Sequence, residues 1–219
     1  MGIVFMAALS SMGQFTDLFE MLRRGVFMMV SASSTTGFQN ITSNQLVTVI
    51  SSGALLTLAL LMAVGGSSGS TAGGMKLLRL GLIAKSVVAT IKQALAPDSA
   101  LVSVSFQHLG KHVLTADVVK TALTVSALFA ATYVAGSLVG IAHGYDATSS
   151  IFESIAMASN GGLSSGIITP GMPASLELFY IFEMWAGRLE FITLIALIVK
   201  IVVSIIPKDK KQLISSRMR

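Results

Sequence analysis

The chain reads Gly65-Gly66-Ser67-Ser68-Gly69-Ser70-Thr71-Ala72-Gly73-Gly74 directly after an apolar segment, Leu46 to Val64, that holds no charged residue. Glycine and small hydroxyl residues in such a context indicate a helix that breaks inside a membrane. Irregular backbone survives at bilayer depth only where it lines a cavity or is buried in protein. This run therefore predicts a broken membrane helix beside a transport pathway.

The composition agrees with a membrane environment. Hydrophobic residues make up 53% of the chain, charged residues only 11%, and the mean hydropathy is +0.79. A soluble protein carries roughly 25% charged residues. We therefore expect an all-α polytopic membrane protein, with the lipid bilayer as its main partner and with spans at Leu46–Val64, Ala122–Ile141 and Leu176–Ile206.

The positive charges predict the topology. Short loops rich in lysine and arginine stay on the cytosolic side of a membrane. Residues 76–120 and the C-terminus should therefore be cytosolic in a multi-pass protein of the cell (plasma) membrane. This bias also explains the pI of about 9.7, so no nucleic acid partner is expected. Arg23 and Arg24 break the pattern, and the residues that set it are Lys76, Arg79, Lys85, Lys92, Lys111, Lys120, Lys200, Lys208, Lys210, Lys211, Arg217 and Arg219.

The chain also repeats itself at an offset of 125 residues. Phe27–Phe38 then falls on Phe152–Leu163 without a gap, and both segments end in small polar residues and glycine. Each apolar stretch is too short to cross a bilayer, and a long apolar span follows it. The order predicts two helix–pore-loop–helix repeats, in which the carbonyl end of a re-entrant half-helix favours a cation.

The residues at the two loop positions suit an alkali cation. Ser34–Gly37 and Ser159–Gly162 offer carbonyl and hydroxyl oxygens that can replace a hydration shell. Neither stretch contains a carboxylate, which argues against a strong divalent site. The alternative is that both are ordinary polar turns between helices.

Three segments together carry a resemblance to a known family. They are Val30–Phe38, the run Gly65–Gly74 followed by Met75-Lys76, and Met184-Trp185-Ala186-Gly187-Arg188-Leu189-Glu190. The chain resembles the Trk/Ktr/HKT superfamily of potassium-uptake membrane subunits, of the TrkH/KtrB kind. Members carry four helix–pore-loop–helix repeats around one pore, and the resemblance covers only the C-terminal half, as the third and fourth repeats.

The resemblance assigns roles to particular residues. It implies a glycine-rich gate loop at Gly65–Gly74 and potassium as the transported ion, bound at Thr36, Gly37, Gly161 and Gly162. The loops lack the longer Thr-Val-Gly-Tyr-Gly filter of tetrameric potassium channels, so potassium selectivity is inferred from kinship alone. The filter residues that it implies are Thr35, Thr36, Gly37, Phe38, Asn160, Gly161, Gly162 and Leu163.

Arg188 is the third implied functional element. The 125-residue offset places it opposite Ala63 and places Glu190 opposite Gly65, so the charged pair and the glycine-rich run should lie at similar depth. A charge there is costly unless it faces water or a partner. The resemblance makes Arg188 an electrostatic barrier to cations in the pore. Alternatively, Arg188 pairs with Glu183 or Glu190 to hold helices together, and the glycine-rich run is only a close-packing surface.

The domain organisation follows from the repeats. We expect the third repeat at 1–95, a cytosolic connector at 96–115, the fourth repeat at 116–207 and a basic tail at 208–219. The resemblance implies assembly with the N-terminal half of the same transporter or a second copy, a dimer of complete transporters, and a cytosolic nucleotide-binding regulatory subunit of the TrkA/KtrA kind. The chain has no G-x-G-x-x-G phosphate loop, so a nucleotide site is expected only in that partner.

Other function classes remain as alternatives. A sodium-conducting or ion-coupled relative would look similar, and a truncated or accessory membrane subunit that does not conduct is the rival of another class. Ser67 lies in a G-x-S-x-G match, but the histidines His108, His112 and His143 fall in cytosolic or outer segments and cannot serve it. The i, i+4 pair His108 and His112 is a weak metal signal. We therefore do not expect an enzyme.

Overall fold

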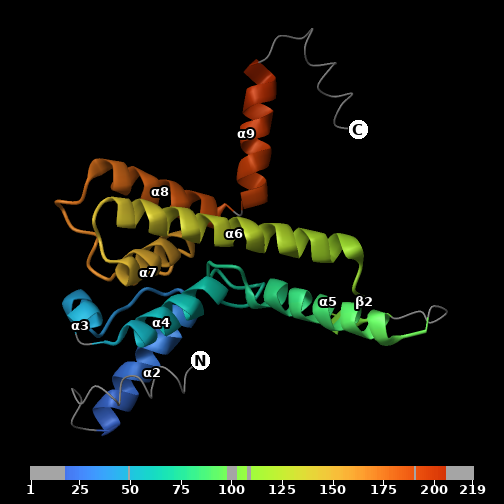
Figure 1. The fold of residues 1–219 in the computed structure, drawn as a ribbon, viewed down its shortest axis with the longest axis horizontal. Helices are drawn as coiled ribbons and strands as arrows, with labels where there is room; N and C mark the ends of the chain where they lie inside the picture. Colours follow the sequence, from blue (N-terminus) through green and yellow to red (C-terminus); the bar gives the residue numbers. More distant parts are fainter. Residues whose placement is uncertain (1–17, 49, 98–102, 108–109, 190, 206–219) are drawn as a thin grey trace.

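The computed structural model describes residues 18–48, 50–97, 103–107, 110–189 and 191–205, and these residues are mostly helical (Figure 1). The helices and strands, in chain order, are α2 (Leu18–Ser34), α3 (Ser43–Thr48), α4 (Ser52–Val64), α5 (Leu77–Leu95), β1 (Ser105–Gln107), β2 (Lys111–Val113), α6 (Ala116–Ala142), α7 (Ala147–Ala158), α8 (Ala174–Arg188) and α9 (Phe191–Ile205).

The helix α6 is the one described helix that is long and apolar enough to cross a membrane. Its 27 residues reach about 40 Å at 1.5 Å per residue. Shorter apolar helices lie at Ser52–Val64 and Thr193–Ser204. Length and composition alone would also fit a core helix, so α6 supports a membrane class without establishing it.

The predicted span Leu46–Val64 is not one helix. The helix α3 ends at Thr48, and α4 starts after Ser51, whose hydroxyl accepts a hydrogen bond from the Ala54 amide at 3.3 Å. Serine at an N-cap satisfies an amide that has no partner within the helix, so it favours a new start over continuation. Only the second part of the predicted span is therefore a regular apolar helix.

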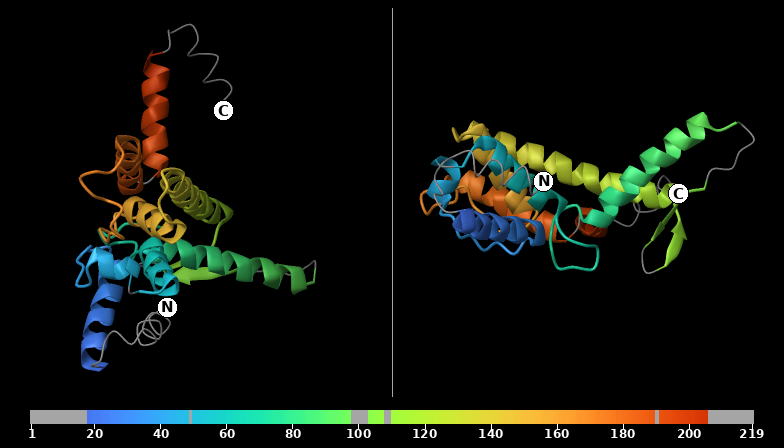
Figure 2. Two further views of the ribbon diagram at one scale, coloured as in Figure 1. Left: turned by 60° about the vertical axis from the view of Figure 1, so that its left-hand side comes forward. Right: turned by 90° about the horizontal axis from the view of Figure 1, so that it is seen from below.

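The predicted span Leu176–Ile206 is also divided. The helix α8 ends at Arg188, where the Leu189 amide bonds back to the Trp185 carbonyl at 3.1 Å, and α9 begins at Phe191. Figure 1 shows α9 standing steeply away from α8, and Figure 2 shows the same change of direction from another side. When the chain is aligned with itself at the offset of 125 residues, this break corresponds to Gly65, the residue that caps the end of α4.

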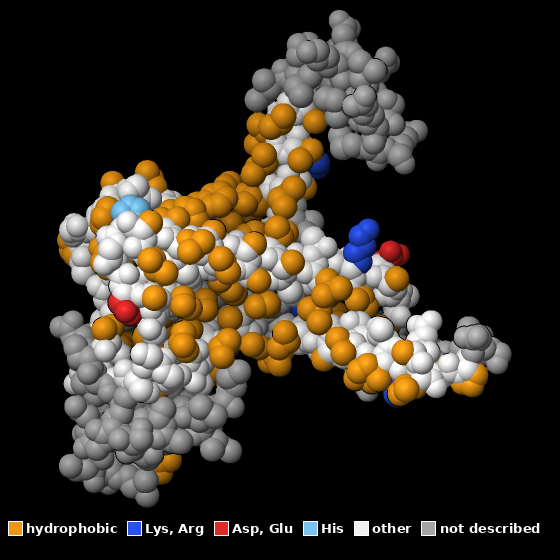
Figure 3. All heavy atoms as spheres, viewed as in Figure 1, with side chains coloured by type: hydrophobic (Ala, Val, Ile, Leu, Met, Phe, Trp, Pro, Cys, Tyr) orange, Lys and Arg blue, Asp and Glu red, His pale blue; other side chains and the backbone are white. Residues whose placement is uncertain are grey.

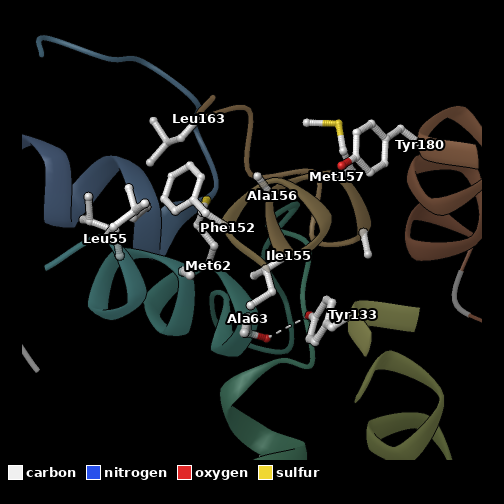
Figure 4. Close-up of a cluster of buried hydrophobic side chains, with 14 of the residues drawn as sticks. Leu55, Met62, Ala63, Tyr133, Phe152, Ile155, Ala156, Met157, Leu163 and Tyr180 are labelled. Carbon is white, nitrogen blue, oxygen red and sulfur yellow. Dashed lines mark hydrogen bonds between the residues drawn. The ribbon is translucent and has the colours of Figure 1, made fainter. Parts of the chain in front are cut away.

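The short helix α7 is enclosed by three other helices. It contacts α4, α6 and α8, and every residue from Phe152 to Ala158 is buried. Figure 4 shows Phe152 of α7 and Leu163 of the following loop beside Leu55 and Met62 of α4. All four side chains are at most 3% exposed, so they form the core around the carbonyl end of α7.

The outward face of the molecule remains apolar. Figure 3 shows hydrophobic side chains over α6, α8 and α9, and Leu138 on α6 is 61% exposed. Apolar area of this extent suits contact with lipid or with further protein.

The connector between α5 and α6 contains a small antiparallel hairpin. Phe106 of β1 lies opposite His112 of β2, and the Lys85 ammonium donates to the Ser105 carbonyl at 2.9 Å. The described residues are therefore mostly helical, as expected, and include one short two-stranded hairpin. His112 lies in strand β2 and not in a helix. His108 lies outside the described residues, so the predicted histidine pair stays a prediction.

Gly187 generates the first prediction. A Cβ at this position would collide with the Ala158 carbonyl of α7. We expect Gly187→Ala to destabilise the purified protein by about 1–3 kcal/mol, because over-packing forces the backbones apart. The control is Gly81→Ala in α5, where nothing lies within 4 Å of an added Cβ and alanine is the better helix former. Thermal unfolding in detergent measures both, and equal midpoints for the two variants would contradict the packing argument.

Candidate functional site: two glycine loops and the loop beside them

The two loops that the 125-residue offset superposes have the same backbone conformation. Thr35 has φ 51° and Asn160 has φ 52°, while Gly37 has φ 83° and Gly162 has φ 73°. Positive φ is uncommon for a residue with a side chain, so its occurrence at both equivalent positions is a specific similarity. The residue two places on is glycine in both loops, which permits the second positive φ.

The hydrogen bonds that end α2 and α7 are equivalent too. The Thr36 amide bonds to the Ser31 carbonyl at 3.0 Å, and the Gly161 amide bonds to the Ala156 carbonyl at 2.7 Å. Both bonds reach back five residues, as in a helix that closes on a left-handed residue. The helices α2 and α7 therefore end in the same way and direct their carbonyl ends toward the glycine loops.

The loops meet at their glycines. A Cβ added to Gly37 would lie 3.0 Å from the Gly162 Cα, and one added to Gly162 would lie 2.9 Å from the Gly37 Cα. Beside this contact the Gln39 amide nitrogen donates to the Ser164 carbonyl at 3.1 Å, and the Ser164 amide donates to the Gln39 side-chain oxygen at 3.3 Å. Gln39 and Ser164 are themselves 125 residues apart, so each loop contacts its own repeat equivalent twice.

The predicted filter residues do not share one environment. Thr36, Phe38 and Gly162 are exposed, whereas Leu163 is 0% exposed and packs in the core. The Phe38 carbonyl accepts a hydrogen bond from the Ser31 hydroxyl at 2.6 Å. This carbonyl is therefore engaged within the protein.

Glu153 was not predicted from the sequence as a site residue. It is 0% exposed in α7, and it accepts hydrogen bonds from the Ser164 hydroxyl at 2.9 Å and from the Ser165 amide and hydroxyl at 2.8 and 2.5 Å. It thereby fixes the loop that follows Gly162. For Glu153, the signal available in the sequence was its position as the single carboxylate inside the apolar stretch 151–158. For Gln39, the signal was its offset of 125 residues from Ser164.

The two ends of the predicted gate loop, at the end of α4 and the start of α5, lie next to each other. The helix α4 ends at Gly65 with φ 67°, and the chain comes back through the Met75 amide, which bonds to the Ala63 carbonyl at 2.9 Å. The Leu77 amide at the start of α5 bonds to the Gly66 carbonyl at 3.1 Å. The residues between form a closed loop with a fixed base.

This loop lies against the C-terminal ends of both α2 and α7. The Gly73 amide donates to the Thr35 hydroxyl at 3.0 Å, and Gly73 packs so closely on the Ser159 carbonyl that no side chain fits there. The Arg188 guanidinium donates to the Thr71 carbonyl at 2.9 Å. A cavity of about 210 Å³ adjoins these contacts, lined by Ser70, Thr71, Ala72, Gly73, Gly74, Lys76, Phe129, Gly187 and Arg188.

Arg188 lies beside the glycine-rich loop and not beside Glu183. Between these two described residues there is no ion pair, and Glu183 instead accepts a hydrogen bond from the Ser154 hydroxyl at 3.0 Å. Glu190 lies outside the described residues. The loop, Arg188 and the carbonyl end of α7 thus form one contiguous cluster.

The two anchors of the loop generate the second prediction. Arg188→Gln removes the charged donor to Thr71, and Thr35→Val removes the acceptor for Gly73. The chain has no cysteine, so Ala72→Cys, at a position 8% exposed, reports opening of the loop through its rate of thiol labelling. Arg188→Gln should raise this rate about tenfold, because a hydrogen bond to a charged group contributes roughly 1.5–3 kcal/mol and 1.4 kcal/mol is a factor of ten. Thr35→Val should raise it about two- to tenfold, because a neutral hydrogen bond contributes roughly 0.5–1.5 kcal/mol. Ser67→Cys, at an exposed position, is the control, and unchanged labelling of Ala72→Cys would show that these contacts do not hold the loop.

Comparison with known proteins assigns the family. A family model described as TrkH, cation transport protein, matches residues 8–210. The protein named uncharacterized cation transporter MJ1485, from Methanocaldococcus jannaschii, is 34% identical over 172 residues, which cover 78% of this chain and 35% of that relative. The crystal structure of the potassium transporter TrkH from Vibrio parahaemolyticus matches with a TM-score of 0.71 and 24% identity, over 90% of this chain and 41% of that one.

These matches differ in what they show. The match to the solved structure establishes the fold, and the chain spans well under half of the length of either relative. The family model, by contrast, covers nearly the whole chain. The protein therefore belongs to the TrkH family of cation transport proteins.

Proposed function

We propose that this chain forms the second half of a potassium-uptake pathway, with two helix–pore-loop–helix repeats that each contribute one loop to an ion filter. Membership of the TrkH family makes it a membrane protein of a transporter family, and no covalent chemistry is required of it. The observation that carries the proposal is the meeting of Gly37 and Gly162 in loops of equal conformation.

The chemistry of the loops supports a monovalent cation as cargo. The carbonyl ends of α2 and α7 carry partial negative charge, and both helices stop at the loops. Residues 34–38 and 159–163 contain no carboxylate, so backbone and hydroxyl oxygens are the available ligands. We assign potassium to the carbonyls of Thr36, Gly37, Gly161 and Gly162, with Thr35 and Asn160 shaping the turns.

The loop Gly65–Gly74 and Arg188 are proposed as the gate. The loop packs on the Ser159 carbonyl at the end of α7, and Arg188 adds a fixed positive charge beside it. A positive charge near the cation route raises the electrostatic barrier to passage, and it does so most where water is excluded. Displacement of the loop and of Arg188 together would lower this barrier.

The arrangement in the cell follows from the same proposal. The third repeat occupies 1–95, the connector 96–115, the fourth repeat 116–207 and the basic tail 208–219, with the connector and tail cytosolic at the plasma membrane. One chain supplies two of four filter loops, so a first half of the transporter must complete the pore. A dimer of complete transporters and a cytosolic nucleotide-binding regulator remain proposed partners.

Growth of potassium-uptake-deficient cells tests the function and is the third prediction. We expect this chain, co-expressed with a first half, to restore growth at low potassium, and we expect Gly162→Asp to abolish rescue because a side chain there meets the Gly37 backbone. Gly171→Asp is the matched control, since nothing lies within 4 Å of an added Cβ at that position.

The other outcomes have separate meanings. Rescue by this chain alone would show that two repeats suffice. If the chain inserts in the membrane with a first half and Gly162→Asp still supports growth, the assigned filter is wrong. Sodium uptake without potassium rescue would identify a sodium-conducting relative, and no flux of either ion would identify a non-conducting subunit.

A further inference from the structure

One buried carboxylate holds the loop that follows Gly162. The Ser164 hydroxyl donates to Glu153 Oε1 at 2.9 Å, and the Ser165 amide donates to Glu153 Oε2 at 2.8 Å, with the Ser165 hydroxyl as a further donor to Oε2. Glu153 itself is 0% exposed on α7. Charge-assisted hydrogen bonds are roughly twice as strong as bonds between neutral groups. A single side chain therefore fixes two successive residues of this loop.

The same network reaches the other glycine loop through Ser164. The Ser164 hydroxyl accepts a hydrogen bond from the Gly166 amide at 3.0 Å, which leaves its own hydrogen for Glu153. The backbone of Ser164 exchanges two hydrogen bonds with the Gln39 side chain, at 3.1 and 3.3 Å. Gln39 follows Gly37 in the chain by the same two positions by which Ser164 follows the second filter glycine. A continuous path of hydrogen bonds thus joins α7 to both loops.

The two repeats differ at the position of this carboxylate. The offset of 125 residues places Met28 of α2 opposite Glu153, and Met28 is apolar and 0% exposed. The loop after α2 has an anchor of its own, the bond from the Ser31 hydroxyl to the Phe38 carbonyl at 2.6 Å. Beyond Phe38, its hydrogen bonds to the loop after α7 run through Gln39. One carboxylate therefore serves both loops, directly on one side and through Gln39 on the other.

We propose that Glu153 is a positioning residue for both filter loops and thereby sets the preference of the pathway for potassium over sodium. This role rests on the potassium function proposed above. Both carboxylate oxygens are occupied by Ser164 and Ser165, so Glu153 acts through the loops and not as an ion ligand. Carbonyls that are held apart suit the larger potassium ion, whereas a loop that is free to relax can close around the smaller sodium ion.

The substitution Glu153→Gln isolates this role. Glutamine keeps the size of the side chain but removes its charge, and its NH₂ end cannot accept a hydrogen bond. In either orientation of the amide, at least one donor of Ser164 or Ser165 loses its acceptor, and the remaining bonds are weaker. The backbone of Ser164 then passes the change to Gln39 in the other loop.

Sodium inhibition of potassium uptake tests the proposal and is the fourth prediction. In uptake-deficient cells that carry this chain and a first half, the readout is the sodium concentration that halves uptake, divided by the potassium concentration that half-saturates it. Glu153→Gln should lower this ratio about three- to tenfold, because it weakens charge-assisted hydrogen bonds. Glu177→Gln, the same change at an exposed position of α8, should leave the ratio unchanged. A carboxylate that only supports folding would lower the maximal rate and leave the ratio unaffected.

A double substitution tests the path between the loops. Gln39→Met keeps the length of a half-buried side chain but removes both of its bonds to Ser164, so it should lower the ratio by a factor similar to that of Glu153→Gln. Because the two residues lie on one path, their effects should not multiply in the double variant. Multiplied effects would show that the loops are held independently and would overturn the shared role of Glu153.

The filter variant separates this proposal from the function on which it rests. Loss of uptake in Gly162→Asp, together with an unchanged ratio in Glu153→Gln, would overturn the positioning role and leave the filter in place. Continued uptake in Gly162→Asp would instead overturn the filter, and the positioning role with it. If Glu153→Gln does not fold or transport, Gln39→Met decides, and an unchanged ratio in that variant would contradict the proposal.

Discussion

The carbonyl end of α7 is held by backbone contact with two glycines, and much of the described structure depends on that contact. Gly73 of the loop between α4 and α5 lies on the Ser159 carbonyl, and Gly187 of α8 lies on the Ala158 carbonyl. Neither position can accept a Cβ without moving a helix. Because α7 is surrounded by α4, α6 and α8, a shift at its end would be transmitted to all three.

This contact joins the loop Gly65–Gly74, the loop that follows α7 and Arg188 into one connected group. The loop is fixed at its base by the hydrogen bonds of Ala63 and Gly66, and in its second half by the bonds of Gly73 to Thr35 and of Thr71 to Arg188. The Tyr133 hydroxyl adds a longer bond of 3.4 Å to the Ala63 carbonyl, drawn in Figure 4. Arg188 of α8 and Thr35, directly after α2, thus contact the loop itself, while Tyr133 of α6 contacts the end of α4 from which the loop starts.

Much of this arrangement could be predicted from the sequence, but not all. The 125-residue offset identified Thr35, Gly37 and their equivalents Asn160 and Gly162, because local backbone requirements appear directly as glycine and small polar residues. The break between Arg188 and Phe191 and the start of α4 at Ser51 were missed, because apolar composition does not reveal where a helix changes direction. Glu153 and Gln39 were missed for another reason: their partners, Ser164 and Ser165, are distant in sequence, and only the folded chain brings them together.

The paired contacts of Gly37 with Gly162 and of Gln39 with Ser164 have a geometric consequence. When two copies of a unit are related by a rotation, a residue can touch its own copy only if it lies close to the rotation axis. A rotation that relates the two segments superposed by the 125-residue offset would therefore have its axis beside these four residues.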